Sequence, residues 1–194
     1  MRTLAQWLAR CLEWMLLGIA IGCLGTYGYE TVAARHFQAE QAAAFARASK
    51  ASAALSVRKG GLLGMLDVPR LRLSTPVIEG DDTRTLKRAV GHLPDTPMPW
   101  EEGNSAVAGH RDGLFRPLKD VKVGDEIRFR TTRDQFRYRV TKTAIVMPDD
   151  VSVLETQQHS TLTLITCYPF YYVGAAPQRF VIHAERLASA TPSE

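Results

Sequence analysis

The sequence predicts a mostly β domain, closed into a barrel and preceded by one long N-terminal helix. Residues 14–29 contain no charged side chain, and residues 31–59 are rich in Ala, with charged and amide side chains interspersed. From Gly60 onward, short β-type runs alternate with Pro, Gly and Asp. About eight short strands with little helix favour a closed or nearly closed barrel.

The apolar segment predicts a membrane-spanning helix. The sixteen residues of 14–29 would span about 24 Å, and extension back to Cys11 approaches the ~30 Å apolar core of a bilayer. Arg2 and Arg10 precede the run, so the N-terminus is expected in the cytoplasm and the rest of the chain outside it. A cleavable secretory signal ending near Ala34 is the alternative, and it exports the same domain.

The chain divides into three expected parts. Residues 1–30 form the cytoplasmic N-terminus and transmembrane signal-anchor, 31–60 a helical stalk, and 61–190 the exported domain. The net charge of +4 is modest, and the arginines at 128, 130, 137 and 139 alternate along strands. Such alternation is typical of a solvated strand face, so no nucleic-acid partner is expected, whereas a basic surface near a membrane favours anionic lipid.

Within the exported domain, turn residues separate the expected elements. Short helical segments are expected at 83–90 and 114–119, and a hairpin turns at Arg133 and Asp134. Prolines at 94, 97 and 99 mark a loop, and 147–159 is a longer connection. The expected strands are 63–68, 71–78, 105–108, 126–131, 135–146, 160–166 and 179–187.

Cys167 is the candidate nucleophile. It ends an expected strand, and the other two cysteines lie within the first 23 residues. An unpaired cysteine in an oxidising compartment is a liability unless its reactivity is used. The alternative is a buried core thiol that packs as a small hydrophobe.

A nucleophilic cysteine needs a proton partner and a stabiliser of the oxyanion that it creates. His110 leads as the base because it follows a strand of small residues, while His183 and His92 stay open as candidates. His159 lies roughly 26 Å from the thiol along the strand and cannot reach it. Arg179 opens the last strand, and its guanidinium offers a fixed fork of donors; an ordinary surface arginine is the alternative.

Three segments together resemble the sortase family of membrane-anchored cysteine transpeptidases. Residues 163–167 (TLITC) resemble its Thr-Leu-x-Thr-Cys motif, 104–112 (NSAVAGHRD) its histidine segment, and 177–180 (PQRF) its arginine segment. The likeness covers 62–187. Its details look closest to the class D-like sortases of proteobacteria, sometimes called class GN, which implies a periplasmic catalytic domain on the inner membrane.

The resemblance implies an eight-stranded sortase barrel with short helices. It also implies cleavage, between Thr and Gly, of a Leu-Pro-x-Thr-Gly-like sorting signal near the C-terminus of another exported protein. Cys167 would hold the acyl group as a thioester, His110 would transfer protons, Arg179 would stabilise the oxyanion, and Thr166 would add a contact. An amine acceptor would complete transpeptidation, whereas water would give hydrolysis.

The resemblance implies that the connection 147–159 corresponds to the sortase loop that receives the Leu-Pro part of the signal. For any single residue of this connection, packing of a short helical turn is the alternative. No cofactor or metal is expected, although three carboxylates of this loop imitate the calcium site of some sortases. Those carboxylates are Asp149, Asp150 and Glu155. The expected substrate-binding residues are Met147, Val151, Val153 and Leu154, with Thr166 beside the nucleophile.

Three alternatives stay open. Residues 93–97 (LPDTP) resemble a sorting signal, but Pro97 makes the scissile bond a tertiary amide, so a plain loop is favoured over a regulatory substrate mimic. An exported cysteine enzyme such as a peptidoglycan L,D-transpeptidase would carry a Ser-x-Gly-Cys-type motif, and Thr166 replaces that glycine. A catalytically silent, membrane-tethered binding module would leave Cys167 inert.

Overall fold

The computed structural model describes residues 2–50, 58–155, 159–172 and 174–188. The chain forms two compact units, 1–37 and 38–194. The helix α1 (Arg2–Lys50) supplies the first unit and the start of the second. Its part Arg10–Ala48 is long and apolar enough to cross a membrane. The expected stalk is therefore helical as far as Lys50, and its residues 51–57 lie outside the described part of the chain.

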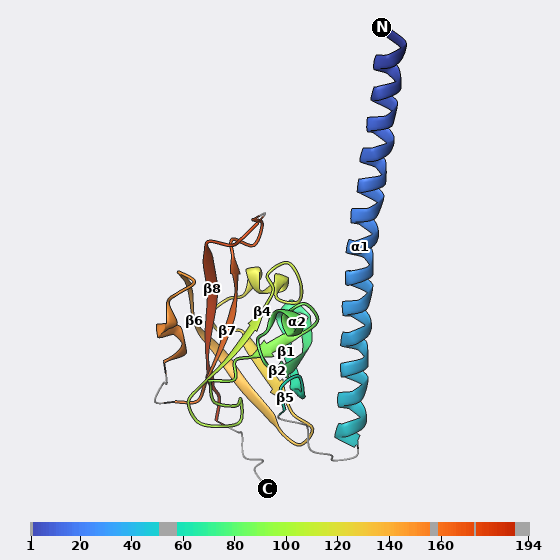
Figure 1. Ribbon diagram of the computed structural model, residues 1–194. Coiled ribbons are helices and arrows are strands. Elements are labelled where there is room, and N and C mark those ends of the chain that lie inside the picture. The colour runs from blue at the N-terminus through green and yellow to red at the C-terminus, as the bar shows by residue number, and fades with distance from the viewer. Residues whose placement is uncertain (1, 51–57, 156–158, 173, 189–194) are drawn as a thin grey trace. The chain divides into compact units, whose positions relative to one another are not determined.

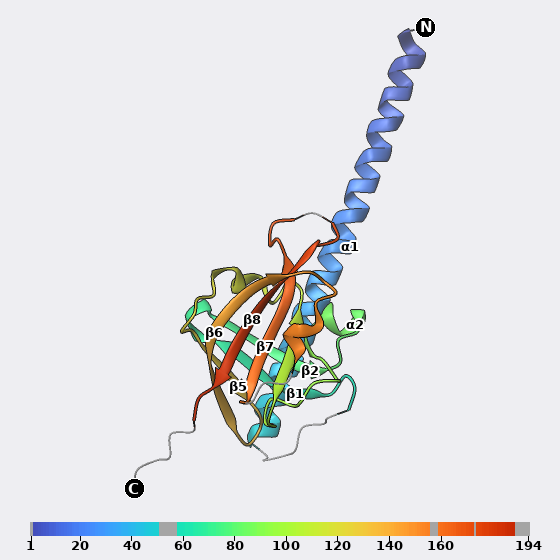
Figure 2. The ribbon, with the colours of Figure 1, turned by 90° about the vertical axis from the view of Figure 1, so that its left-hand side faces the viewer.

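The second unit contains a closed barrel of eight strands (Figures 1 and 2). Their order around the barrel is β1-β2-β3-β4-β7-β8-β6-β5, with parallel pairs β2/β3 and β4/β7. The eight-stranded, mostly β fold expected from the sequence is thus confirmed. The strands are β1 (Leu62–Val68), β2 (Leu73–Glu79), β3 (Val90–His92), β4 (Asn104–Gly109), β5 (Glu126–Arg130), β6 (Gln135–Val146), β7 (Thr161–Tyr168) and β8 (Gln178–Arg186).

Short helical segments fill the connections. The α-helix α2 (Thr83–Leu86) begins at Asp82, whose carboxylate accepts hydrogen bonds from the amides of Arg84 and Thr85. Three 3₁₀ segments are η1 (Pro69–Leu71), η2 (Arg116–Asp120) and η3 (Val151–Leu154).

Alternation along the strands separates an interior face from an exterior one. In β7, Leu162 and Leu164 are fully buried in the core, while Ile165 and Cys167 are half-buried on the opposite face. The interior is filled by aliphatic and aromatic side chains from every side of the barrel. They include Leu63, Leu66, Val77, Val107, Phe115, Ile127, Phe129, Tyr138 and Ile182.

Three differences between the structure and the expected elements have a clear physical reason. The segment 83–90 is helical only to Leu86, and its last residue, Val90, begins β3. This strand has three residues, too few to show the alternation of buried and exposed side chains that identifies a strand in a sequence. The second strand begins at Leu73 instead of residue 71, because Pro69 starts a 3₁₀ turn that ends at Arg72 in the left-handed region (φ 52°). Strand β7 runs past Cys167, since that residue pairs with β8.

Candidate functional site

Strand register brings His110, Cys167 and Arg179 to one edge of the barrel. Gly109, the last residue of β4, pairs with Thr166 of β7, so His110, which directly follows β4, and Cys167 of β7 are the next residues after this pair. Cys167 in turn pairs directly with Arg179 of β8. Directly opposed residues of neighbouring strands have Cα atoms roughly 5 Å apart. The three residues expected to carry the chemistry are therefore neighbours, although 69 positions separate the first from the last (179 − 110).

Cys167 is a half-buried free thiol on the outer face of the sheet. It shares that face with Ile165, two residues earlier in β7. The intervening Thr166 is buried, and its hydroxyl donates a hydrogen bond to the Gly109 carbonyl at 2.7 Å. Thr166 thus ties the strand carrying the thiol to the strand that leads into His110, and its expected contact with substrate stays a prediction.

His110 begins the loop that follows β4 and is half-buried. Its carbonyl accepts hydrogen bonds from the amides of Gly113 and Phe115, which fold this loop into a tight turn. The buried Phe115 ring lies against Gly109, where an added Cβ would come within 2.7 Å of it. A glycine before His110 is therefore required by close packing.

Arg179 is half-buried at the start of β8. Its Nη1 donates to the backbone carbonyls of Gln178 (3.1 Å) and Ala176 (3.4 Å). Among the described residues, no carboxylate forms an ion pair with it. The guanidinium is thus anchored through one nitrogen and keeps donors available for an anion.

An apolar pocket of ≈ 290 Å³ adjoins Arg179. Its floor includes Ala108, Ile165 and Val181, which occupy matching register positions on β4, β7 and β8. The connection between β6 and β7 forms a wall, and all four apolar residues expected there line the pocket: Met147, Val151, Val153 and Leu154. Leu86 and Leu93 also contribute. The arrangement suits a short apolar stretch of peptide ending near the thiol.

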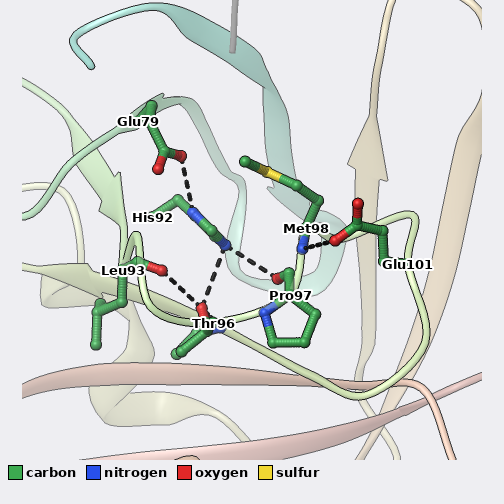
Figure 3. A network of polar contacts seen from close by, with 8 residues as sticks. Glu79, His92, Leu93, Thr96, Pro97, Met98 and Glu101 are labelled. Atoms are coloured by element: carbon green, nitrogen blue, oxygen red, sulfur yellow. Dashed lines mark hydrogen bonds and ion pairs between the residues drawn. The ribbon is translucent and has the colours of Figure 1, made fainter. Parts of the chain in front are cut away.

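A buried polar network that the sequence did not predict supports Leu93 (Figure 3). The fully buried His92 ring lies with Nδ1 2.8 Å from Glu79 Oε2 and Nε2 3.0 Å from the Pro97 carbonyl. Because that carbonyl can only accept, Nε2 carries a hydrogen. Thr96 Oγ1 donates to the Leu93 carbonyl and accepts from the Ala106 amide.

The LPDTP segment is therefore built into the barrel. Its backbone is fixed by His92 from one side and by Thr96 from within. Its first residue, Leu93, donates its amide hydrogen to Ala106 of β4 and lines the pocket. These bonds favour the plain structural loop over the substrate mimic. His92 itself lies in this network, where it supports the loop.

Arg111 is a second residue whose role sequence reasoning missed. It follows His110 directly, is 8% exposed, and donates from Nη2 to the carbonyls of Tyr172 (2.7 Å) and Gly174 (3.0 Å). The guanidinium also lies over the Tyr172 ring. Arg111 therefore links the histidine loop to the loop between β7 and β8. Arg111 lies in the GHRD segment, but no neighbouring residue indicates that it bonds to carbonyls more than 60 positions away.

Of the three carboxylates considered for calcium, Asp150 has a different role. Asp150 caps η3, accepting from the amide (3.1 Å) and the hydroxyl (2.6 Å) of Ser152. In the part of the chain that the structure describes, no three His, Cys, Asp or Glu side chains are grouped closely enough to hold a metal ion. His183, another candidate base, pairs with Thr163 in place of the thiol.

Comparison with known proteins agrees with this fold. The sortase domain model matches residues 66–187. The chain is 37% identical over 140 residues to Sortase D of Bacillus subtilis, which covers 72% of this chain and 71% of that protein. It is 30% identical over 117 residues to Sortase A of Staphylococcus aureus, which covers 56% of each.

Solved structures give the same answer. A Clostridium perfringens Sortase D5 transpeptidase superposes with a TM-score of 0.66 at 26% identity, covering 79% of this chain and 98% of that one. Sortase A of Corynebacterium diphtheriae superposes with a TM-score of 0.62 at 28% identity, covering 69% of this chain and 63% of that one. The chain belongs to the sortase family and is a transpeptidase of the sortase type.

Proposed function

We propose that this sortase cleaves a Leu-Pro-x-Thr-Gly-like sorting signal between Thr and Gly and transfers the acyl portion to an amine acceptor. The observation that carries the proposal is the register of β4, β7 and β8, in which Cys167 stands between His110 and Arg179. A nucleophile, a proton carrier and a fixed cation at one sheet edge are the set that acyl transfer requires.

The first half of the reaction forms a thioester. Cys167 gives its thiol proton to His110 as Sγ attacks the threonine carbonyl, and the Arg179 guanidinium donates hydrogen bonds to the oxyanion that develops on the carbonyl oxygen. The carbon–nitrogen bond to glycine breaks, and His110 gives a proton to the leaving amine. The acyl group stays on sulfur.

The second half returns the enzyme to its starting state. The acceptor amine attacks the thioester carbonyl while His110 removes its proton. The carbon–sulfur bond breaks, and Cys167 leaves as the thiolate, which takes from His110 the proton that came from the acceptor amine. Water in place of the amine gives hydrolysis. A pocket ending at Arg179 and lined by Val151, Val153 and Leu154 suits the Leu-Pro portion of the signal.

The subclass and location are part of the same proposal. Two relatives bear Sortase D names, which supports a class D-like assignment, while the proteobacterial subclass rests on the resemblance of the motifs alone. The apolar part of α1 supports a single-pass anchor in the inner membrane, in contact with lipid, with residues 1–30 ending at its outer side. The catalytic domain, 61–190, then lies in the periplasm, where it meets exported protein substrates.

The test is to follow acylation of the enzyme by a sorting-signal peptide, detected as a mass increase on Cys167. We expect Cys167→Ala to abolish both the adduct and peptide cleavage while the barrel stays folded. Cys23→Ala is the matched control, because that exposed helix cysteine lies outside the barrel unit. Cleavage by Cys167→Ala would exclude the mechanism, and failure of small thiol reagents to label Cys167 would favour a silent binding module.

A further inference from the structure

Asn104 is a buried side chain outside the catalytic set whose hydrogen-bonding positions are all filled. It is 1% exposed at the start of β4. Its Nδ2 donates to the carbonyls of Val153 (3.0 Å) and Glu155 (3.2 Å). Its Oδ1 accepts from the hydroxyls of Thr161 (3.1 Å) and Thr163 (2.7 Å). One amide therefore joins β4, β7 and the loop that contains η3.

The direction of these bonds is determined by their partners. The carbonyls of Val153 and Glu155 can only accept, so the NH₂ group faces the loop and the amide oxygen faces β7. Thr163 gives its single hydroxyl hydrogen to Asn104, so it accepts from His183 Nδ1 at 3.1 Å. Burial, and secondly the charge of Lys142, lower the pKa of His183, which favours the neutral ring with its hydrogen on Nδ1.

One carbonyl that Asn104 holds belongs to Val153, which lines the substrate pocket, and the other belongs to Glu155, which directly follows the lining residue Leu154. Val151, Val153 and Leu154 of η3 line that pocket opposite Ala108 and Ile165. The Asp150 carboxylate, by contrast, accepts from the amide and hydroxyl of Ser152, so its cap shapes η3 from within the same loop. The amide of Asn104 thus fixes the distance between the loop wall and the sheet.

We propose that Asn104 is a specificity-determining positioning residue, which sets the shape of the pocket by fastening η3 to β4 and β7. This inference rests on the proposed function, in which that pocket receives the apolar start of the sorting signal. It assigns to Asn104 no contact with the reacting atoms. Asn104 affects which peptides bind, whereas the reaction itself depends on Cys167, His110 and Arg179.

The decisive variant is Asn104→Asp, which keeps the acceptor oxygen that faces Thr161 and Thr163 but replaces the donor group that faces Val153 and Glu155 with a second acceptor oxygen. Thr161→Val is the matched control, because it removes one bond on the strand side and leaves both loop bonds in place. Should Asn104→Asp not fold, Asn104→Ser removes the same donors with a smaller side chain. Each protein is measured with peptides that carry Leu or Ala at the first position of the signal.

We expect Asn104→Asp to raise KM for the Leu peptide about tenfold, the loss that one or two hydrogen bonds produce. The preference for Leu over Ala falls by a similar factor, while kcat and the rate of Cys167 alkylation by iodoacetamide stay within about twofold of wild type. Amide exchange in 147–155 becomes faster. Thr161→Val leaves KM and loop exchange near wild type.

Unchanged KM and peptide preference in Asn104→Asp would overturn the inference. So would a loss of kcat and thiol reactivity at unchanged KM, or an equal effect of Thr161→Val. If wild type forms no adduct with either peptide, the proposed function fails, and amide exchange alone then decides: faster exchange in 147–155 of Asn104→Asp supports the fastening role, and unchanged exchange rejects it.

Discussion

Two regions of the barrel use arginine in opposite ways. On the outer face of β1, β5 and β6, Arg130 forms a two-bond ion pair with Asp67, and Arg128 and Arg137 share Glu126. At the catalytic edge, Arg179 bonds to backbone carbonyls and, among the described residues, to no carboxylate. The first region neutralises its cations, and the second leaves one available.

This difference separates a structural arginine from the arginine that is proposed to act in catalysis. A guanidinium that already faces a carboxylate would have to break that pair before it could stabilise an oxyanion. Carbonyl partners orient Arg179 without cancelling its charge. Composition gives the 24 Lys and Arg residues equal weight, so the partner of each arginine is the feature that distinguishes them.

The largest expected effect comes from removing the arginine of each region in turn. Arg179→Ala should lower kcat/KM for a sorting-signal peptide by roughly 10²–10³, since it removes the donor to the oxyanion. Arg130→Ala, its matched control, should keep activity and lower the free energy of unfolding by about 1 kcal/mol, a modest effect because the pair is partly exposed. Near-normal turnover by Arg179→Ala would end the distinction between the two regions.

A smaller effect tests the packing that fixes the catalytic edge. Gly109→Ala places a Cβ within 2.7 Å of the Phe115 ring. We expect a loss of about 1–3 kcal/mol in unfolding free energy, together with slower acylation of Cys167 as His110 shifts. Thermal unfolding and adduct formation measure the two effects.

Gly113→Ala is the matched control for that packing test. A Cβ at Gly113 finds no atom nearer than 3.8 Å, so both stability and acylation should stay near wild type. Equal behaviour of the two alanine variants would show that the close contact at Gly109 does not constrain the site.

The smallest effect concerns the charged face and its pH dependence. Hydrogen bonds from Arg137, then Arg128, lower the pKa of Glu126 to about 2. A depressed folded-state pKa means that the stabilisation is complete above the ordinary pKa of 4.5 and is lost as the pH falls toward 2. Glu126→Gln should remove this contribution, below about 1 kcal/mol for an exposed pair, and flatten unfolding free energy between those pH values. If the unfolding free energy changed by the same amount between pH 5 and pH 2.5 in wild type and in Glu126→Gln, the prediction would be contradicted.

Much of the site was predictable because its signals are local. The motif around Cys167, the strand before His110 and the residues beside Arg179 are short strings that carry their own chemistry. The apolar residues of 147–154 were also recognisable as a candidate peptide-binding loop. The strand β3 was not predicted, because three residues are too few to show the alternation typical of a strand. It is recognised only in the fold, where it pairs with β2 and β4.

The residues of the chain alone predicted the mostly β fold and the apolar N-terminal helix, since both depend on composition and on neighbours in the chain. The three candidate catalytic residues were selected by the resemblance of their short motifs to those of sortases. The tertiary structure alone decided their adjacency, through the pairs Gly109–Thr166 and Cys167–Arg179. It also decided the supporting roles of Asn104, His92 and Arg111. Their hydrogen bonds are specified by geometry, because any carbonyl or carboxylate can accept them and folding alone selects which one lies within reach.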